Sequence, residues 1–332
     1  MRAVVLTEYK QPLELIEVEE PQVGERDVLV AVEAVGLNQL DEKIRAGEFA
    51  QILPYSLPVV MGNDVAGTVI RVGRLVESFR PGDLVFALPD QNRMGAFAER
   101  IAVAEADLAL IPEGISMAEA ASLPLVALTA WQALVERGHV GPGQRVLIHA
   151  GAGGVGSIAI QLAKHLGAIV ATTASAANAD FVRELGADVV IDYRSEDFEK
   201  ILSEYDFVLD SLGGENLEKS LRVLKPGGLA VGISGPPDPA FAKRMGLGVM
   251  VRLAIAVLSR RIRRQAKRLG VTYEFLFMRA DGEQLSRIAA LVDGGALRPV
   301  VAKTYPFGQI PAALADLASG GGRGKIVATL ER

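Results

Sequence analysis

Short, valine-rich apolar stretches separated by turn residues dominate the first third of the chain. They lie at residues 28–35, 65–72, 84–88 and 96–103 and are interrupted by Gly, Pro and Asp. Pro81-Gly82-Asp83 is typical of a turn, because proline presets φ at one corner and glycine relieves the next. The pattern predicts a β-rich unit up to about residue 110.

Beyond residue 144, short β-branched runs alternate with segments of helical period. The first such pair is 145–149 followed by 155–166, and β texture returns at 300–305 and 325–330. Parallel strands need helical crossovers, and a repeated strand–helix alternation supplies them. We therefore predict an α/β fold with a doubly wound parallel sheet.

The composition is that of an ordinary soluble globular protein. Half of the 332 residues are hydrophobic, and 40 acidic against 35 basic side chains give a net charge of −5. This length predicts two domains, and the acidic balance gives no reason to expect nucleic acid as a partner. The chain has no cysteine. That excludes disulfides, thiolate nucleophiles, iron–sulfur clusters and cysteine-ligated zinc.

Targeting signals are not visible in the sequence. The first eight residues turn polar too soon for the apolar region of a signal peptide. No stretch approaches the roughly 18 uncharged apolar residues of a membrane span. We therefore expect a cytoplasmic protein.

The strongest chemical signal is a glycine-rich turn between a predicted strand and a predicted helix. The apolar run 146–148 leads into Gly151-Ala152-Gly153-Gly154-Val155-Gly156, which has the G-x-G-x-x-G spacing. Such a turn lets backbone amides at a helix N-terminus face a pyrophosphate, because glycine permits close approach. The order of strand, glycines and helix predicts a dinucleotide site.

The end of the next strand bears on which dinucleotide binds. NAD-binding units place an acid there to bind the ribose 2′-hydroxyl. Here the strand ends without a carboxylate, and Thr173, Ser175 and Asn178 offer hydroxyl and amide groups to a 2′-phosphate. This favours NADP. The nearest cation is in Tyr193-Arg194, although Arg194 is equally well explained as a solvated surface charge.

Several motifs together resemble the medium-chain dehydrogenase/reductase superfamily, and the resemblance covers essentially the whole chain. The motifs are the glycine turn and segments 62–67, 81–85, 128–134 and 210–214. The resemblance implies a β-rich, GroES-like catalytic domain formed by residues 1–116 and 298–332. It also implies a Rossmann dinucleotide-binding domain at residues 117–297.

The resemblance also bears on metal. Where zinc alcohol dehydrogenases of this superfamily have a cysteine and a histidine as ligands, this chain has Asn38 and Asn63. The four-cysteine structural zinc lobe is absent as well. The three histidines, His139, His149 and His165, are scattered, and we interpret them as structural or surface residues. The chain thus resembles the zinc-independent quinone oxidoreductase branch, which includes alkenal and enone reductases, and we expect no metal.

That branch transfers hydride from NADPH to a quinone or to the β-carbon of an α,β-unsaturated carbonyl. Conjugation spreads the incoming charge, so hydrogen-bond donors can stabilise the product anion without a metal. Residues 35–47 resemble the branch's cleft segment, which implies catalytic positions at Asn38, Asp41 and Lys43. Some relatives have tyrosine in place of Lys43. Lys43 either stabilises the developing oxyanion or pairs with Asp41 as a structural bridge, and the bridge is favoured.

The resemblance implies further contacts with NADPH. We expect Thr129 near the nicotinamide or its phosphate, and Tyr193 at the 2′-phosphate. The pyrophosphate should lie against Ala152, Gly153, Gly154 and Val155. Residues that follow strand ends should line the cofactor: Ser211, Leu212, Gly213, Ile233 and Ser234.

Two weaker sets complete the predicted cofactor site. Phe275 and Phe277 either shape the nicotinamide pocket or are plain core. In the C-terminal glycine-rich loop, relatives place an arginine on the 2′-phosphate where this chain has glycine, and Arg323 or Lys325 is the candidate substitute.

A basic segment departs from the acidic whole. Residues 243–268 contain nine basic residues and no acid, and begin with an apolar run at 246–258. We interpret this segment as a helix that covers the Rossmann sheet and ends in a solvated basic turn. A membrane surface or RNA is the less favoured partner.

The leading hypothesis is a homodimeric, NADPH-dependent reductase of quinones or enones. Dimerisation is implied by the resemblance, with 271–275 as the candidate edge strand across a two-fold axis. One alternative is an NADPH-binding adaptor with affinity for RNA or a membrane surface. The other is an enoyl-thioester reductase.

Overall fold

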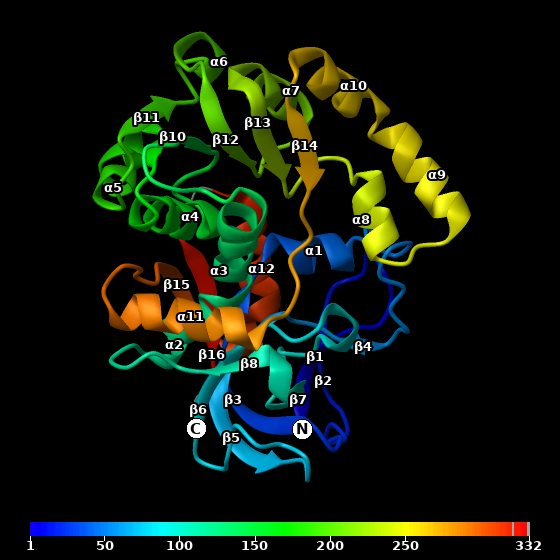
Figure 1. Cartoon of the computed structure of the whole chain (residues 1–332). Helices are drawn as coiled ribbons and strands as arrows, with labels where there is room; N and C mark the ends of the chain where they lie inside the picture. The colour runs from blue at the N-terminus through cyan, green and yellow to red at the C-terminus, as the bar shows by residue number, and fades with distance from the viewer. Residues whose placement is uncertain (321, 331–332) are drawn as a thin grey trace. The chain divides into compact units, whose positions relative to one another are not determined.

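The computed structural model describes residues 1–320 and 322–330, in two compact units (Figure 1). Unit 1 comprises Met1–Leu128 and Arg279–Arg332, and unit 2 comprises Thr129–Met278. The helix α3 (Pro124–Trp131) crosses the first boundary and continues into a π-helical turn, Gln132–Arg137. We describe each unit by itself.

Unit 1 is built on a mostly antiparallel sheet. Within the described residues the strand order is β15-β16-β3-β5-β6-β8, with β7 paired to β3, and β2-β1-β4 form a separate small sheet. The strands are β1 (Arg2–Leu6), β2 (Glu14–Glu17), β3 (Asp27–Leu37), β4 (Val59–Val60), β5 (Asp64–Val72), β6 (Leu84–Ala87), β7 (Arg100–Ala104), β8 (Leu108–Leu110), β15 (Val301–Pro306) and β16 (Lys325–Thr329). The helices are α1 (Gln39–Arg45), α2 (Met117–Ala121), α11 (Gly282–Asp293) and α12 (Ile310–Ser319). The β-rich N-terminal unit predicted from the sequence is confirmed.

The long strand β3 organises unit 1 because it pairs with β5, β7 and β16. Its end approaches α2 so closely that a Cβ on Gly36 would lie 2.4 Å from the carbonyl oxygen of Ala121. Only glycine fits at that position. The contact fixes the end of β3, where the polar residues described below begin.

Unit 2 is a doubly wound parallel sheet, as predicted. Its described strands run in the order β11-β10-β9-β12-β13-β14 and all pair in parallel. They are β9 (Arg145–Ile148), β10 (Ile169–Ala174), β11 (Val189–Asp192), β12 (Tyr205–Asp210), β13 (Leu224–Gly232) and β14 (Thr272–Phe275). The helices are α4 (Gly154–His165), α5 (Ala179–Glu184), α6 (Phe198–Ile201), α7 (Gly214–Val223), α8 (Pro239–Arg244), α9 (Val249–Leu258) and α10 (Arg260–Leu269). The strand order reverses between β9 and β12, which is where such sheets bind dinucleotides.

The two units divide at places other than the predicted domain boundaries. The division follows Leu128 and Met278, because α2 packs against β3 and α11 against β8. The boundaries at residues 116 and 298 stay predictions about the functional domains.

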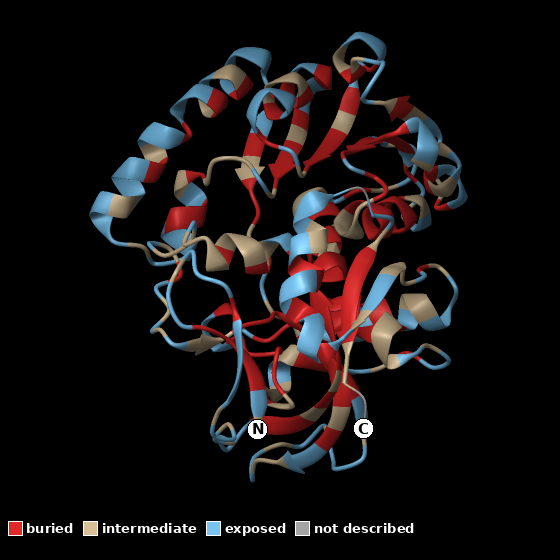
Figure 2. Cartoon of the chain, turned by 180° about the vertical axis from the view of Figure 1, so that it is seen from behind, coloured by how far each residue is buried: buried red, intermediate tan, exposed pale blue. Residues whose placement is uncertain are grey.

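The basic segment contains the last two residues of α8 and then the two helices α9 and α10, not one helix over the sheet. Helix α10 packs against α7 and β14 and buries Ile262 and Ala266, whereas α9 buries only Ile255 (Figure 2). In the described part of the chain, no helix has both the length and the apolarity needed to cross a bilayer.

Candidate dinucleotide site and buried polar cluster

The glycine turn leads from β9 into α4 and leaves its central residues accessible. A Cβ on Gly151 would lie 2.1 Å from Thr172 Oγ1, and one on Gly156 would lie 2.3 Å from the carbonyl oxygen of Ala150. Those two glycines are needed for packing within unit 2. A Cβ on Gly153 would lie 3.3 Å from the carbonyl oxygen of Ala150, which is a tight contact but a milder one than at the other two glycines.

The first turn of α4 fits a pyrophosphate. Gly153 is the N-cap, and Gly153, Gly154 and Val155 are all partly exposed. The first amides of a helix have no intrahelical partner and carry the positive end of its dipole. The Gly153 amide already donates to the carbonyl oxygen of Ala150 at 2.9 Å, so the amides of Gly154 and Val155 are the ones placed to bind an anion. Ala152 is buried beneath them.

The neighbouring strand ends hold the predicted ribose-side residues. Thr173 and Ser175 at the end of β10 are buried, and the Tyr193 amide donates to the carbonyl oxygen of Ala174 at 3.3 Å. Tyr193 is exposed, and the Arg194 guanidinium lies 5.8 Å from the centre of its ring. The structure therefore brings Tyr193 and Arg194 next to the end of β10. Asn178 follows that strand in the same loop.

A buried series of hydrogen bonds, which the sequence did not predict, supports the edge of the sheet where β9, β10 and β12 end. Nδ1 of His149 lies 3.1 Å from Thr173 Oγ1, and Nε2 lies 2.9 Å from Ser220 Oγ. Ser220 donates to Asp210 Oδ2 at 2.9 Å, and Asp210 Oδ1 accepts the Gly213 amide at 2.7 Å. Burial lowers the pKa of His149, so the ring stays neutral. These hydrogen bonds connect the ends of β9, β10 and β12 to α7.

The other predicted cofactor residues of unit 2 are only partly at this edge. Ser211, Leu212 and Gly213 follow β12, and Ile233 and Ser234 follow the adjacent β13. Phe275 is buried in edge-to-face contact with Phe241, with ring centres 5.0 Å apart, as the core alternative expects. Phe277 is partly exposed, 6.2 Å from the same ring. Thr129 is buried in α3.

In unit 1, the end of β3 and the start of β5 hold a buried polar cluster of Asn38, Asp41, Asn63, Asp64 and Lys325. All five are buried. Asn38 is the N-cap of α1, and its backbone N–H donates to Asp41 Oδ2 at 2.8 Å. Asn38 Nδ2 donates to Asp64 Oδ2 at 2.9 Å, and Asn63 Nδ2 donates to Asp41 Oδ1 at 2.6 Å. The cluster thus links two neighbouring strands to the first turn of α1.

Burial sets the electrostatics of Asp41. Loss of solvent raises the pKa of this carboxyl to about 7, against the lowering effect of the hydrogen bonds from Asn63 and Asn38. Asn63 Oδ1 is buried beside it and has no hydrogen-bond partner. A protonated Asp41 could donate to an amide oxygen there, which an ionised Asp41 cannot.

Lys325 closes the cluster with its ammonium group. Nζ donates to the carbonyl oxygen of Leu37 at 2.8 Å, to Asn38 Oδ1 at 2.5 Å and to Asp64 Oδ2 at 2.9 Å. An ammonium has three donors, so all are used. Lys325 was predicted as a candidate cation for the 2′-phosphate, and we do not retain that role. Arg323, two residues earlier, is exposed.

Lys43 is placed differently from Asn38 and Asp41. It is partly exposed on α1, and within the described residues its side chain forms neither an ion pair nor a hydrogen bond. The favoured interpretation of a bridge to Asp41 is therefore wrong. Both Asp41 oxygens accept from Asn38 and Asn63 instead.

The cluster does not fit zinc. Zinc prefers thiolate, imidazole and carboxylate ligands. Here the oxygens of Asp41 and Asp64 already accept hydrogen bonds, Asp64 Oδ1 from the Leu125 amide at 2.7 Å, and an ammonium ion lies among them. Across residues 1–320 and 322–330 no group of three His, Cys, Asp or Glu side chains could hold a metal.

A doubly wound unit with an accessible glycine turn, joined to a β-rich unit with a buried polar cluster, defines a pyridine-nucleotide oxidoreductase of the alcohol dehydrogenase type. Residues 24–113 match the alcohol dehydrogenase GroES-like domain, and residues 185–327 match the family described as zinc-binding dehydrogenase.

Individual relatives narrow the class. The chain is 35% identical to NAD(P)H oxidoreductase RTN4IP1, mitochondrial, of Danio rerio over 92% of this chain and 84% of the relative. It is also 35% identical to the NADPH-dependent alkenal/one oxidoreductase, chloroplastic, of Arabidopsis thaliana, over 92% and 73%. The solved quinone oxidoreductase of Coxiella burnetii superimposes with a TM-score of 0.87 at 31% identity, over 100% of this chain and 99% of that one. The chain belongs to the medium-chain dehydrogenase/reductase superfamily, on the branch of the quinone and alkenal oxidoreductases.

Proposed function

We propose that this protein transfers hydride from NADPH to a quinone or to the β-carbon of an α,β-unsaturated carbonyl, without zinc. The observation that carries the proposal is the Lys325 ammonium in the polar cluster of unit 1. The family's zinc chemistry has no suitable ligand set there. An acceptor that delocalises the incoming charge needs no Lewis acid. The relatives named above include reductases of both acceptor classes.

In this proposal unit 2 binds the cofactor at the edge where its parallel strands end. NADPH supplies the hydride and is oxidised to NADP⁺. The amides of Gly154 and Val155 hold the pyrophosphate, while the Gly153 amide donates to the carbonyl oxygen of Ala150 at 2.9 Å and shapes the turn. Tyr193 and Arg194 face the 2′-phosphate, where Arg194 can donate charge-assisted hydrogen bonds and the β10 end offers no competing carboxylate.

We assign the proton side of the reaction to α1. Hydride addition leaves a hydroquinone or enolate anion that must gain one proton. Lys43 is the predicted catalytic residue whose side chain is not enclosed, and its ammonium can stabilise the oxyanion and donate that proton. Asn38 and Asp41 are positioning residues in this account. They fix the first turn of the helix that carries Lys43.

Turnover is tested by NADPH oxidation with 1,4-benzoquinone, a naphthoquinone, a short 2-alkenal and a pantetheine-linked enoyl thioester. We expect the quinones or the alkenal to be reduced, with NADPH preferred over NADH and no loss of activity after dialysis against a chelator. Tight NADPH binding without turnover would contradict the enzyme proposal. A strong preference for the thioester would favour the enoyl reductase instead.

The role of Lys43 is tested by Lys43→Met, with Lys200→Met as an exposed control on α6. We expect kcat to fall on the order of 100-fold while KM for NADPH stays unchanged. Equal kcat values for the Lys43→Met variant and the parent would refute the assignment.

A homodimer is also part of the proposal. β14 is the last strand of the sheet in unit 2, and its outer edge has no strand partner within the described residues. An antiparallel pairing of two such edges would form one continuous sheet. Light scattering after size-exclusion chromatography would measure the mass.

The cytoplasmic location stays a prediction, since the two curated relatives described above are mitochondrial and chloroplastic.

A further inference from the structure

The apolar side chains of α9 are the most exposed in the described chain. Met250 is 78% exposed, Val257 72%, and Val249 and Leu258 68% each, whereas no large hydrophobic residue outside α9 exceeds 58%. Scattered single apolar residues on a surface are ordinary, but a contiguous set marks a contact. Val249, Leu253 and Val257 follow each other at spacings of four, so they share one helix face.

That face continues directly into the arginines of α10. Ser259 joins the two helices, and its amide donates to Ile255 O while its carbonyl accepts from the Arg263 amide, both at 3.0 Å. Ser259 is thus both the C-cap of α9 and the N-cap of α10, and the two helices follow one another along one side of unit 2 (Figure 1). Arg260, Arg264 and Arg268 follow each other at spacings of four and so share one face of α10, and Val257 of α9 lines the same concavity as these arginines. We call the surface formed by Val249, Leu253, Val257, Arg260, Arg264 and Arg268 the α9–α10 strip.

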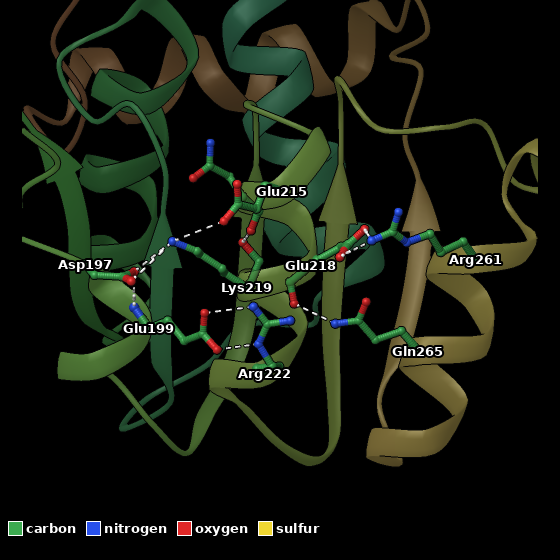
Figure 3. Close-up of polar contacts among 10 residues, drawn as sticks. Asp197, Glu199, Glu215, Glu218, Lys219, Arg222, Arg261 and Gln265 are labelled. Carbon is green, nitrogen blue, oxygen red and sulfur yellow. Dashed lines mark hydrogen bonds and ion pairs between the residues drawn. The ribbon is translucent and has the colours of Figure 1, made fainter.

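The three arginines of the strip are not used by the fold. Within the described residues their side chains form neither ion pairs nor hydrogen bonds. Their neighbours are used: Arg261 pairs with Glu218 at 2.9 Å, and Gln265 donates to the Glu218 carbonyl at 2.9 Å (Figure 3). These contacts hold α10 against α7 and leave Arg260, Arg264 and Arg268 exposed.

The strip borders a concavity suited to anionic groups. It has a volume of about 540 Å³ and is lined by Arg260, Arg261, Arg264, Arg268, Val257 and Glu218. The one carboxylate in it is already neutralised by Arg261. An occupant must therefore bring negative charge to the arginines and apolar groups to the adjoining face of α9.

We propose that the α9–α10 strip docks the protein on the surface of an anionic lipid bilayer. Phosphate headgroups would bind Arg260, Arg264 and Arg268, and the aliphatic side chains of α9 would enter the boundary between headgroups and acyl chains. A second copy through the same face is disfavoured, because α9 and α10 contain no acidic residue, so a two-fold contact would bury the arginines of each copy without a carboxylate opposite them. RNA is disfavoured, because the exposed face of α9 has aliphatic side chains and no aromatic ring for base stacking.

The test is flotation of the full-length chain with vesicles of phosphatidylcholine, alone or mixed with phosphatidylglycerol. We expect binding only to the mixed vesicles, and release at 1 M salt, where the Debye length shrinks to about 3 Å. Replacing Arg260, Arg264 and Arg268 by glutamine should weaken binding on the order of 100-fold. A control with Arg183→Gln, Lys200→Gln and Arg287→Gln removes the same charge elsewhere and should leave binding within a few-fold.

A second variant tests the apolar part of the strip. Val249→Gln, Leu253→Gln and Val257→Gln retain every arginine and should weaken vesicle binding by about 10-fold or more. The proposal is overturned if this variant binds like the parent, if an RNA oligomer displaces the vesicles, or if the variant turns a dimer into a monomer. Reduction of a water-soluble quinone by NADPH should be unchanged in all three variants, which separates failure of the docking proposal from failure of the proposed function.

Discussion

Lys325→Met should strongly destabilise unit 1. The substitution leaves Asp64, whose side chain is fully buried, without its cation, and it also removes a donor from Asn38 and Leu37. Breaking a buried ion pair by removing one partner costs about 3–5 kcal/mol, because the remaining charge is uncompensated. For a unit of about 180 residues, this lowers the melting temperature by roughly 6–20 °C.

The assay is thermal and urea unfolding of the parent, Lys325→Met and the double variant Lys325→Met/Asp64→Asn. The double variant should recover much of the loss, because a neutral amide needs no cation. Lys303→Met on the neighbouring strand is the control: its exposed pair with Asp316 should contribute little. Near-parental stability of Lys325→Met, accompanied by a large loss of NADPH affinity, would refute the structural role and restore Lys325 as a cofactor ligand.

Three further predictions concern the two candidate sites. In the folded parent Asp41 keeps its proton up to about pH 7, whereas in the unfolded chain it releases the proton near pH 4. Between pH 5 and pH 8 the unfolding free energy of the parent should therefore fall by about 3 kcal/mol more than that of Asp41→Asn. Urea titrations at the two pH values measure this difference, and identical pH dependence of the two proteins would contradict it. Gly156→Ala places a Cβ 2.3 Å from the Ala150 carbonyl oxygen and should lower the melting temperature. Gly153→Ala places one at 3.3 Å, so it should lower the melting temperature less and raise the Kd for NADPH about 10-fold or more, which scanning fluorimetry with and without NADPH separates. Arg194→Gln should raise the Kd for NADPH by roughly 10- to 100-fold and leave that for NADH unchanged; equal effects on both would remove Arg194 from the 2′-phosphate.

The fold and half of the site could be predicted because their signals are local. The glycine turn follows a predicted strand and precedes a predicted helix, and that order alone placed the amides of Gly153 to Val155 at a helix N-terminus. The missing carboxylate at the end of β10 is equally visible in the sequence. Such features depend on a few consecutive residues, whose conformational preferences act over the same short range.

The sequence could not predict contacts between residues far apart along the chain. His149 lies 71 residues before Ser220, and nothing local predicts their hydrogen bond or the neutral imidazole it orders. The basic segment likewise has a clear composition, but only packing decides which arginines face solvent. Arg261 and Arg264 have the same residue type, and the position of α7 alone separates them.

Residue types and spacing determined by themselves that this chain folds into a doubly wound unit and a β-rich unit and carries a dinucleotide turn. Those properties follow from periodicity and from the close approach that glycine permits because it has no Cβ. Tertiary structure alone decided that Lys325 belongs to Asp64, across 261 positions of sequence. A buried ammonium binds whichever acceptors the folded backbone brings within about 3 Å, and no local pattern encodes that distance.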